Sequence, residues 1–73
     1  MELGDVEAMA RSLMRTHGLT SWGFRFDRAK RRAGKTDFSG RYISLSAPLM
    51  ALYDDAVRDV ILHEIAHARV GSG

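Results

Sequence analysis

The sequence predicts an α+β domain, because apolar residues recur at helical spacing near both ends and alternate with polar residues in the middle. The chain has 73 residues, no cysteine and one proline, with 45% hydrophobic and 27% charged residues, as in ordinary globular domains. This length allows one domain, residues 1–73, and the lack of cysteine excludes a disulfide framework and a thiolate metal site. No apolar run approaches the roughly 18 residues of a membrane span, and the acidic N-terminus is unlike a secretory signal. We therefore expect a monomeric cytoplasmic protein, nuclear in a eukaryote, with no membrane partner.

The first predicted helix covers residues 5–17. Its apolar residues fall at i, i+3, i+4, i+7 and i+8 and share one face: Val6, Met9, Ala10, Leu13 and Met14. Gly4 or Asp5 is expected to cap its start, and Gly18 suits the left-handed position after its last turn. A half-buried strand follows, in which aromatic residues alternate with others and belong to the core rather than to a base-stacking platform: Trp22, Phe24 and Phe26.

A hairpin is predicted next, with Ser39 and Gly40 as a two-residue turn. The cross-strand pairs that this turn implies are Phe38–Arg41, Asp37–Tyr42 and Thr36–Ile43. One face of the hairpin then carries Thr36, Phe38, Ile43 and Leu45, and the other carries Lys35, Asp37, Tyr42 and Ser44. With the preceding strand, the hairpin is expected to form a three-stranded antiparallel sheet.

Two helices complete the predicted fold. Ser46-Ala47-Pro48 is typical of a helix start, with serine as the cap, and this short helix extends to about residue 52. Tyr53-Asp54-Asp55 predicts the start of a long last helix, since carboxylates are favoured near the positive end of a helix. Apolar residues occupy nearly its whole circumference, so we expect it to be buried, with three solvated residues: Arg58, Asp59 and Arg69.

The last helix contains His63-Glu64-Ile65-Ala66-His67, an H-E-x-x-H motif. Because four residues advance a helix by about 400°, His63 and His67 share a face and can both reach one zinc ion. Glu64 is offset by about 100°, where it can accept a proton from water that the metal activates for attack on a carbonyl. The alternative is a buried helix whose histidines hydrogen-bond internally and whose glutamate meets an arginine. Shuffling this composition gives the motif about once in 300 attempts, which favours the metal site.

Several segments, in order, resemble the SprT-like domain, the zinc-metalloprotease domain shared with the Spartan-type proteases of DNA–protein crosslinks. The resemblance covers residues 9–71 and is carried by Trp22-Gly23-Phe24-Arg25-Phe26, Ala29-Lys30-Arg31-Arg32-Ala33-Gly34, Ile43-Ser44-Leu45-Ser46 and Val60-Ile61-Leu62-His63-Glu64-Ile65-Ala66-His67-Ala68. It implies a zincin-like fold and a metallopeptidase that acts on protein substrates, including DNA-bound proteins as in DNA–protein crosslink repair. It also implies that His63 and His67 are the first two zinc ligands and that Glu64 is the general base.

The resemblance implies a third ligand as well, a histidine downstream of the active-site helix. No residue after His67 can replace it, so we expect the chain to end at a fragment boundary just before that ligand. The 73-residue chain is then expected to fold without metal, to bind zinc weakly and to be inactive, because catalytic zinc sites normally use three protein ligands. His17 is expected to be a C-terminal helix residue rather than a ligand. Asp59 is expected to be solvent-exposed, the alternative being an acceptor that orients His63.

Basic residues concentrate between residues 25 and 41, where seven Lys or Arg stand against two Asp, giving a local charge of +5. The candidate nucleic-acid contacts in the loop before the hairpin are Arg28, Lys30, Arg31, Arg32 and Lys35. A solvated loop is the alternative, and the resemblance favours phosphate contacts. Two other functions thus remain beside the metallopeptidase. One is a catalytically silent nucleic-acid-binding module using residues 28–35, and the other is an inactive structural fragment.

Overall fold

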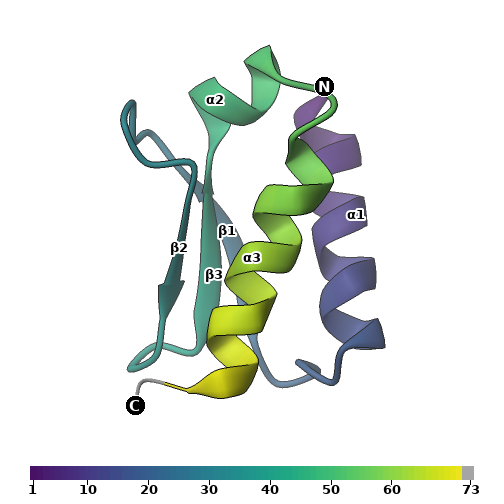
Figure 1. Cartoon of the computed structure of the whole chain (residues 1–73), viewed down its shortest axis with the longest axis vertical. Helices are drawn as coiled ribbons and strands as arrows, with labels where there is room; N and C mark the ends of the chain where they lie inside the picture. The colour runs from purple at the N-terminus through teal and green to yellow at the C-terminus, as the bar shows by residue number, and fades with distance from the viewer. Residues whose placement is uncertain (72–73) are drawn as a thin grey trace.

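A computed structural model describes residues 1–71 (Figure 1). Its elements are α1 (Leu3–Thr16), β1 (Gly23–Asp27), β2 (Gly34–Asp37), β3 (Tyr42–Ser46), α2 (Ala47–Leu52) and α3 (Val57–Val70). The predicted α+β class and the predicted order of elements are confirmed. Helices α1 and α3 lie side by side against one face of the sheet, and α2 sits at the end of β3.

The sheet is mixed, so the prediction of an all-antiparallel sheet is wrong. Strand β3 lies in the centre, antiparallel to β2 and parallel to β1. Phe24 is opposite Ile43 and Phe26 is opposite Leu45, so apolar side chains of β1 and β3 share the face that meets the helices. Two strands with alternating apolar residues can share an apolar face whether they run parallel or antiparallel. The alternation in the sequence therefore did not determine the direction of β1 relative to β3.

The predicted hairpin register is confirmed at two of its three pairs, since Asp37 is opposite Tyr42 and Thr36 is opposite Ile43. The third predicted pair is wrong, because Phe38 and Arg41 belong to the loop between the strands. The core lies between this sheet and the two long helices. Its buried side chains include Val6, Ala10, Met14, Phe24, Ile43, Leu45, Ile61 and Ile65, with Trp22 and Phe26 packed at its margin.

The loop of residues 38–41 is held by Asp37. The Asp37 carboxylate accepts hydrogen bonds from the Gly40 N–H at 2.7 Å and from the Ser39 hydroxyl at 3.2 Å. The Gly40 hydrogen bond is the main cause that keeps the pKa of Asp37 below its usual value. Arg41 has a left-handed backbone with φ of 53°, a conformation that side chains other than glycine rarely adopt.

Helix α1 begins two residues earlier than predicted. Leu3 packs against the core and extends the helix, which makes Glu2 the capping position instead of Gly4 or Asp5. At the other end, Gly18 has φ of +84°, which confirms the predicted left-handed position.

Helix α2 starts as predicted, because the Ser46 hydroxyl accepts a hydrogen bond from the Leu49 N–H at 3.2 Å. Helix α3 begins later than predicted, at Val57. The carboxylate of Asp54 lies 2.6 Å from the amino group of Met1 and so tethers the N-terminus instead of opening α3.

Helix α3 is buried on one side only, so the expectation of a nearly fully buried helix is wrong. Its buried residues are Val57, Ile61, Glu64 and Ile65, and the opposite side exposes His63, Ala66, His67 and Val70. Ala66 and Val70 are apolar but exposed, because no helix or strand within residues 1–71 covers them. None of the helices in residues 1–71 combines the length and apolar character that a membrane crossing requires.

Candidate metal centre

Two histidines meet on the exposed side of α3. The Nε2 atoms of His63 and His67 are 3.1 Å apart, and their rings are nearly perpendicular, with centroids 4.6 Å apart. This contact follows from the spacing of four residues, which stacks one side chain over the other along the helix. Both imidazoles therefore present a ring nitrogen to the same point in space.

The separation of the two nitrogens fits a shared zinc ion. Two ligands with Zn–N bonds of about 2.0–2.1 Å at a tetrahedral angle place their nitrogens about 3.3 Å apart, close to the observed 3.1 Å. Within residues 1–71, no group of three or more His, Cys, Asp or Glu side chains is arranged to hold a metal. The described part of the chain thus offers two imidazole ligands at a plausible separation.

The other two residues considered for this centre lie outside the histidine pair. His17 is the C-terminal capping residue of α1, as predicted, and its Nδ1 is 3.4 Å from Nη1 of Arg69. Asp59 is exposed one turn before His63, and no hydrogen bond joins these two residues in the described structure. Asp59 therefore does not orient His63 here, and solvent exposure, the expected outcome, is confirmed.

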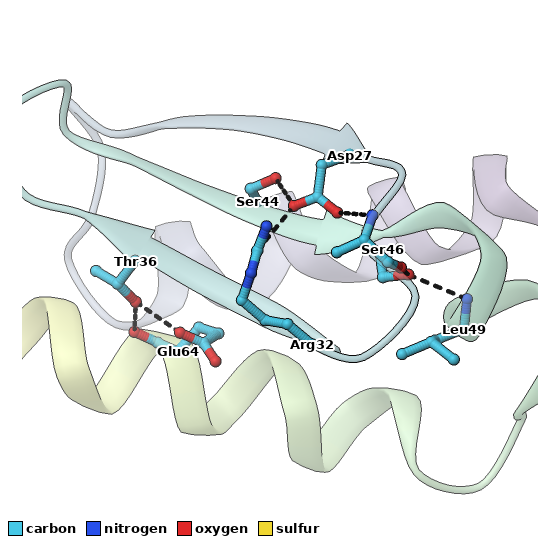
Figure 2. A network of polar contacts seen from close by, with 8 residues as sticks. Asp27, Arg32, Thr36, Ser44, Ser46, Leu49 and Glu64 are labelled. Atoms are coloured by element: carbon cyan, nitrogen blue, oxygen red, sulfur yellow. Dashed lines mark hydrogen bonds and ion pairs between the residues drawn. The ribbon is translucent and has the colours of Figure 1, made fainter.

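Glu64 occupies the buried side of the same helix, with only 7% of its surface exposed. Its side chain points at β2, where the Thr36 hydroxyl donates to Oε1 at 2.8 Å and lies 3.0 Å from the Glu64 main-chain oxygen (Figure 2). Of the alternative reading, one part is met, since the two histidine nitrogens are within hydrogen-bond distance of each other. Its other part is wrong, because none of the ion pairs within residues 1–71 joins Glu64 to an arginine. Burial of a carboxylate without a cation makes this one hydroxyl donor important.

Gly34, the first residue of β2, makes room for that carboxylate. A Cβ at position 34 would lie 2.8 Å from Cγ and 3.0 Å from Oε2 of Glu64. The backbone of Gly34 is not left-handed, because Gly18 and Gly71 are the glycines of the described chain with positive φ. Glycine is thus needed at position 34 for space and not for conformation.

Sequence reasoning did not connect Thr36 or Gly34 with the site. One signal was available for Thr36, which is a hydroxyl residue on the hairpin face that otherwise carries apolar residues. A polar group at such a position needs a buried partner. Gly34 gave no comparable signal, because a glycine at the end of a basic loop is ordinary turn chemistry.

Two hollows flank His63. One is a groove of about 390 Å³ between the start of β2 and the first turns of α3, lined by Ala33, Gly34, Ala56, Asp59, Val60, His63 and Glu64. The other, of about 330 Å³, is lined by His63, Ala66, His67 and Val70. His63 and Glu64 therefore border a mostly apolar groove next to β2, which is an edge strand of the sheet.

A second polar network fixes the start of the basic loop (Figure 2). The Asp27 carboxylate accepts hydrogen bonds from the Ser44 hydroxyl at 2.6 Å, the Ala29 N–H at 3.0 Å and Arg32 Nη1 at 3.2 Å. Burial acts to raise the pKa of Asp27, but these donors and the charges of Arg32 and Lys35 outweigh it and lower the pKa. Arg32 pairs with Asp27 and its side chain is still 43% exposed, so it remains a predicted nucleic-acid contact.

The other basic residues of the predicted nucleic-acid contact are exposed as well, namely Arg28, Lys30, Arg31 and Lys35. Lys35 points from β2 toward Tyr42 on the outer face of the sheet, with Nζ 5.8 Å from the ring centroid. Arg25 on β1 covers the same ring more closely, with Cζ 3.8 Å from the centroid. Basic side chains thus continue from the loop onto the face of the sheet that the helices leave uncovered.

These features define a small α+β domain in which one helix exposes two histidines to solvent and buries, on its other side, a glutamate that lies between them in the sequence. The SprT-like family model matches residues 6–71, so the chain belongs to the SprT-like family. No curated protein and no solved structure matches the chain.

Proposed function

We propose that the chain is the zinc-binding catalytic part of a metallopeptidase that hydrolyses protein substrates, DNA-bound proteins among them. His63 and His67 would hold the metal, and Glu64 is the general base. The observation that carries this proposal is the 3.1 Å separation of the two Nε2 atoms beside a buried glutamate on the same helix. Zinc, when bound, supplies a Lewis acid that polarises the scissile carbonyl and makes water acidic near neutral pH.

The chain's own groups then account for the proton transfers. Glu64 borders the groove beside His63, where its carboxylate can take a proton from the attacking water. The same carboxyl group can return that proton to the amide nitrogen as the peptide bond breaks. Because Glu64 is buried, few solvent molecules compete with the attacking water for the carboxylate.

The edge of the sheet supports an extended peptide as the substrate. Among residues 1–71, strand β2 pairs with β3 alone, and its other side runs past the groove that Glu64 and His63 line. An extended peptide can add to such an edge through main-chain hydrogen bonds, which recognise a peptide without requiring a particular sequence.

The substitution Glu64→Gln tests this function in the complete protein. We expect kcat/KM for a protein substrate to fall by at least about 100-fold, because the amide cannot accept the proton, while zinc affinity changes little. Glu7→Gln, at a half-buried glutamate of α1, is the matched control and should retain activity. Full activity of Glu64→Gln, or no cleavage by the zinc-loaded wild-type protein, would contradict the proposal.

Nucleic-acid binding is a second candidate function, favoured by the arrangement of the basic residues. Of the basic residues between 25 and 41, Arg32 is the one that forms an ion pair within the described chain. The exposed ones, on the loop and on the sheet, leave their charge available to phosphate groups. Because Glu64→Gln keeps this basic surface intact, it should leave any DNA affinity unchanged and so separate the two functions.

A further inference from the structure

The donor to the Glu64 carboxylate comes from a different element than Glu64 itself. Thr36 is 28 positions earlier in the chain, on β2, and its hydroxyl lies 2.8 Å from Oε1. No other residue of the described structure donates a hydrogen bond to this carboxylate, and each buried polar side chain there has a partner. Within the described residues, this hydroxyl is therefore the one hydrogen-bond donor of the Glu64 carboxylate, with the Glu64 main-chain oxygen as its other acceptor at 3.0 Å.

The two carboxylate oxygens have different surroundings. Oε1 accepts the Thr36 hydrogen bond, whereas Oε2 lies beside Gly34, 3.0 Å from the position that a Cβ of residue 34 would take. Gly34 and His63 both line the groove that Glu64 borders. The Thr36 hydroxyl thus contacts one carboxylate oxygen, and the absence of a side chain at Gly34 leaves room for the other.

We propose that Thr36 and Gly34 are positioning residues that hold Glu64 in its reactive orientation, Thr36 by its hydroxyl and Gly34 by the space it leaves. This inference rests on the proposed function. A glutamate side chain has three rotatable bonds, so without a fixed partner its carboxylate samples several positions. A displacement of about 1 Å in a reacting group costs up to about 100-fold in rate.

The first experiment compares Thr36→Val with Thr36→Ser in the complete, zinc-loaded protein. Valine keeps the shape of threonine and removes the hydroxyl, and serine keeps the hydroxyl. Thr36→Val should lower kcat about 10-fold to 100-fold with KM and zinc affinity nearly unchanged, and Thr36→Ser should restore most of the loss. Thr20→Val, an exposed threonine far from the site in sequence, is the matched control and should leave kcat unchanged.

The second experiment changes the space instead of the hydrogen bond. Gly34→Ala places its Cβ against Cγ and Oε2 of Glu64, which must move because they meet the new methyl group at 2.8 Å and 3.0 Å. We expect kcat to fall at least 10-fold while the zinc affinity of His63 and His67 is retained. Gly4→Ala is the matched control, since nothing lies within 4 Å of a Cβ there.

A third measurement does not use activity at all. Thr36→Val should lower the urea midpoint of unfolding in the wild-type background and lower it by less than half as much in a Glu64→Ala background. Equal shifts in the two backgrounds would show that Thr36 does not act through the glutamate and would overturn the inference, even if the protein had no peptidase activity.

The outcomes keep the two proposals apart. Loss of activity in Glu64→Gln together with wild-type kcat in Thr36→Val and Gly34→Ala overturns the positioning role and leaves the peptidase intact. Full activity in Glu64→Gln overturns the peptidase mechanism, and the unfolding midpoints then decide whether Thr36 holds Glu64. A kcat loss in Thr36→Val that Thr36→Ser does not restore also counts against the hydroxyl.

Discussion

Asp27 joins the central strand and the basic loop through a single carboxylate that has three donors. Its donors come from the central strand, from the main chain of the basic loop and from the side chain of Arg32. The pKa of Asp27 is lower in the folded protein than its usual value, so the charged form is the one that stabilises the fold. This stabilisation is present above the usual pKa and disappears as the pH falls through the folded pKa.

Replacing Asp27 with Asn should therefore reduce stability in a pH-dependent way. At pH 7 we expect a loss of at least about 1 kcal/mol, because the amide is neutral and has one acceptor oxygen where the carboxylate uses both. The difference between wild type and variant should shrink below about pH 4, where the wild-type carboxyl also becomes protonated. Urea unfolding at pH 7 and at low pH measures both quantities, and a difference that did not vary with pH would exclude this role of the charge.

For single residues, the sequence predicts only part of the candidate site. Helical spacing alone placed His63 beside His67 and set Glu64 off to one side, because these relations are local to one helix. The partnership of Glu64 with Thr36 and Gly34 depends on how α3 packs against β2, elements some thirty residues apart. No local pattern encodes that register, so the residues that fix the carboxylate had to come from the structure.

The hairpin contains a strained residue whose replacement should stabilise it. Arg41 adopts φ of 53° in an exposed loop, and its side chain makes no ion pair within residues 1–71. Arg41→Gly should raise the free energy of unfolding by up to about 1 kcal/mol, since glycine adopts this backbone without steric cost. Thermal or urea unfolding tests this, with Arg28→Gly as the control at an exposed position where φ is not positive. A destabilised Arg41→Gly protein would show that the arginine side chain matters more than its backbone.

For whole elements, prediction succeeded where pairing was local and failed where it was not. The alternation of residues and the turn sequence gave the pairs Asp37–Tyr42 and Thr36–Ile43, which lie close together in the chain. The direction of β1 depends on distant contacts, and β3 was not predicted to have two neighbours. The exposure of α3 was also missed, because counting apolar residues such as Ala66 and Val70 does not say what lies over them.

The charge distribution of the whole molecule leads to a prediction about salt. If the basic loop contacts phosphate groups, log Kd for duplex DNA should rise with log salt concentration. The double substitution Lys30→Ala and Arg31→Ala should reduce the magnitude of that slope by about 2, one for each lost contact. Arg15→Ala, an exposed arginine of α1, is the control. An unchanged slope in the loop variant would show that these two residues do not contact phosphate groups.

The number of zinc ligands in the described chain leads to a prediction about zinc affinity. The described residues offer two imidazoles for one ion, so the 73-residue chain should fold without metal and bind zinc weakly. Binding should weaken further at acidic pH, because only neutral imidazole is a ligand. Calorimetric titration of the chain and of His67→Ala measures this. Tight, stoichiometric binding that His17→Ala abolished would reveal a ligand that the structure does not bring to the pair.

The central place of β3 also sets the order in which the sheet can assemble while the chain is being synthesised. Strands β2 and β3 pair across a loop of residues 38–41, whereas the partner of Gly23 is Tyr42, 19 positions later. Both ladders must wait for β3 to emerge; β1 waits longest because it is synthesised first, and its pairing closes the longer loop, which is slower than the local pairing of β2 with β3. Until then, β1 is an unpaired strand that carries Phe24 and Phe26. Of the three strands, β1 therefore has the longest interval in which a nascent chain could aggregate through its edge.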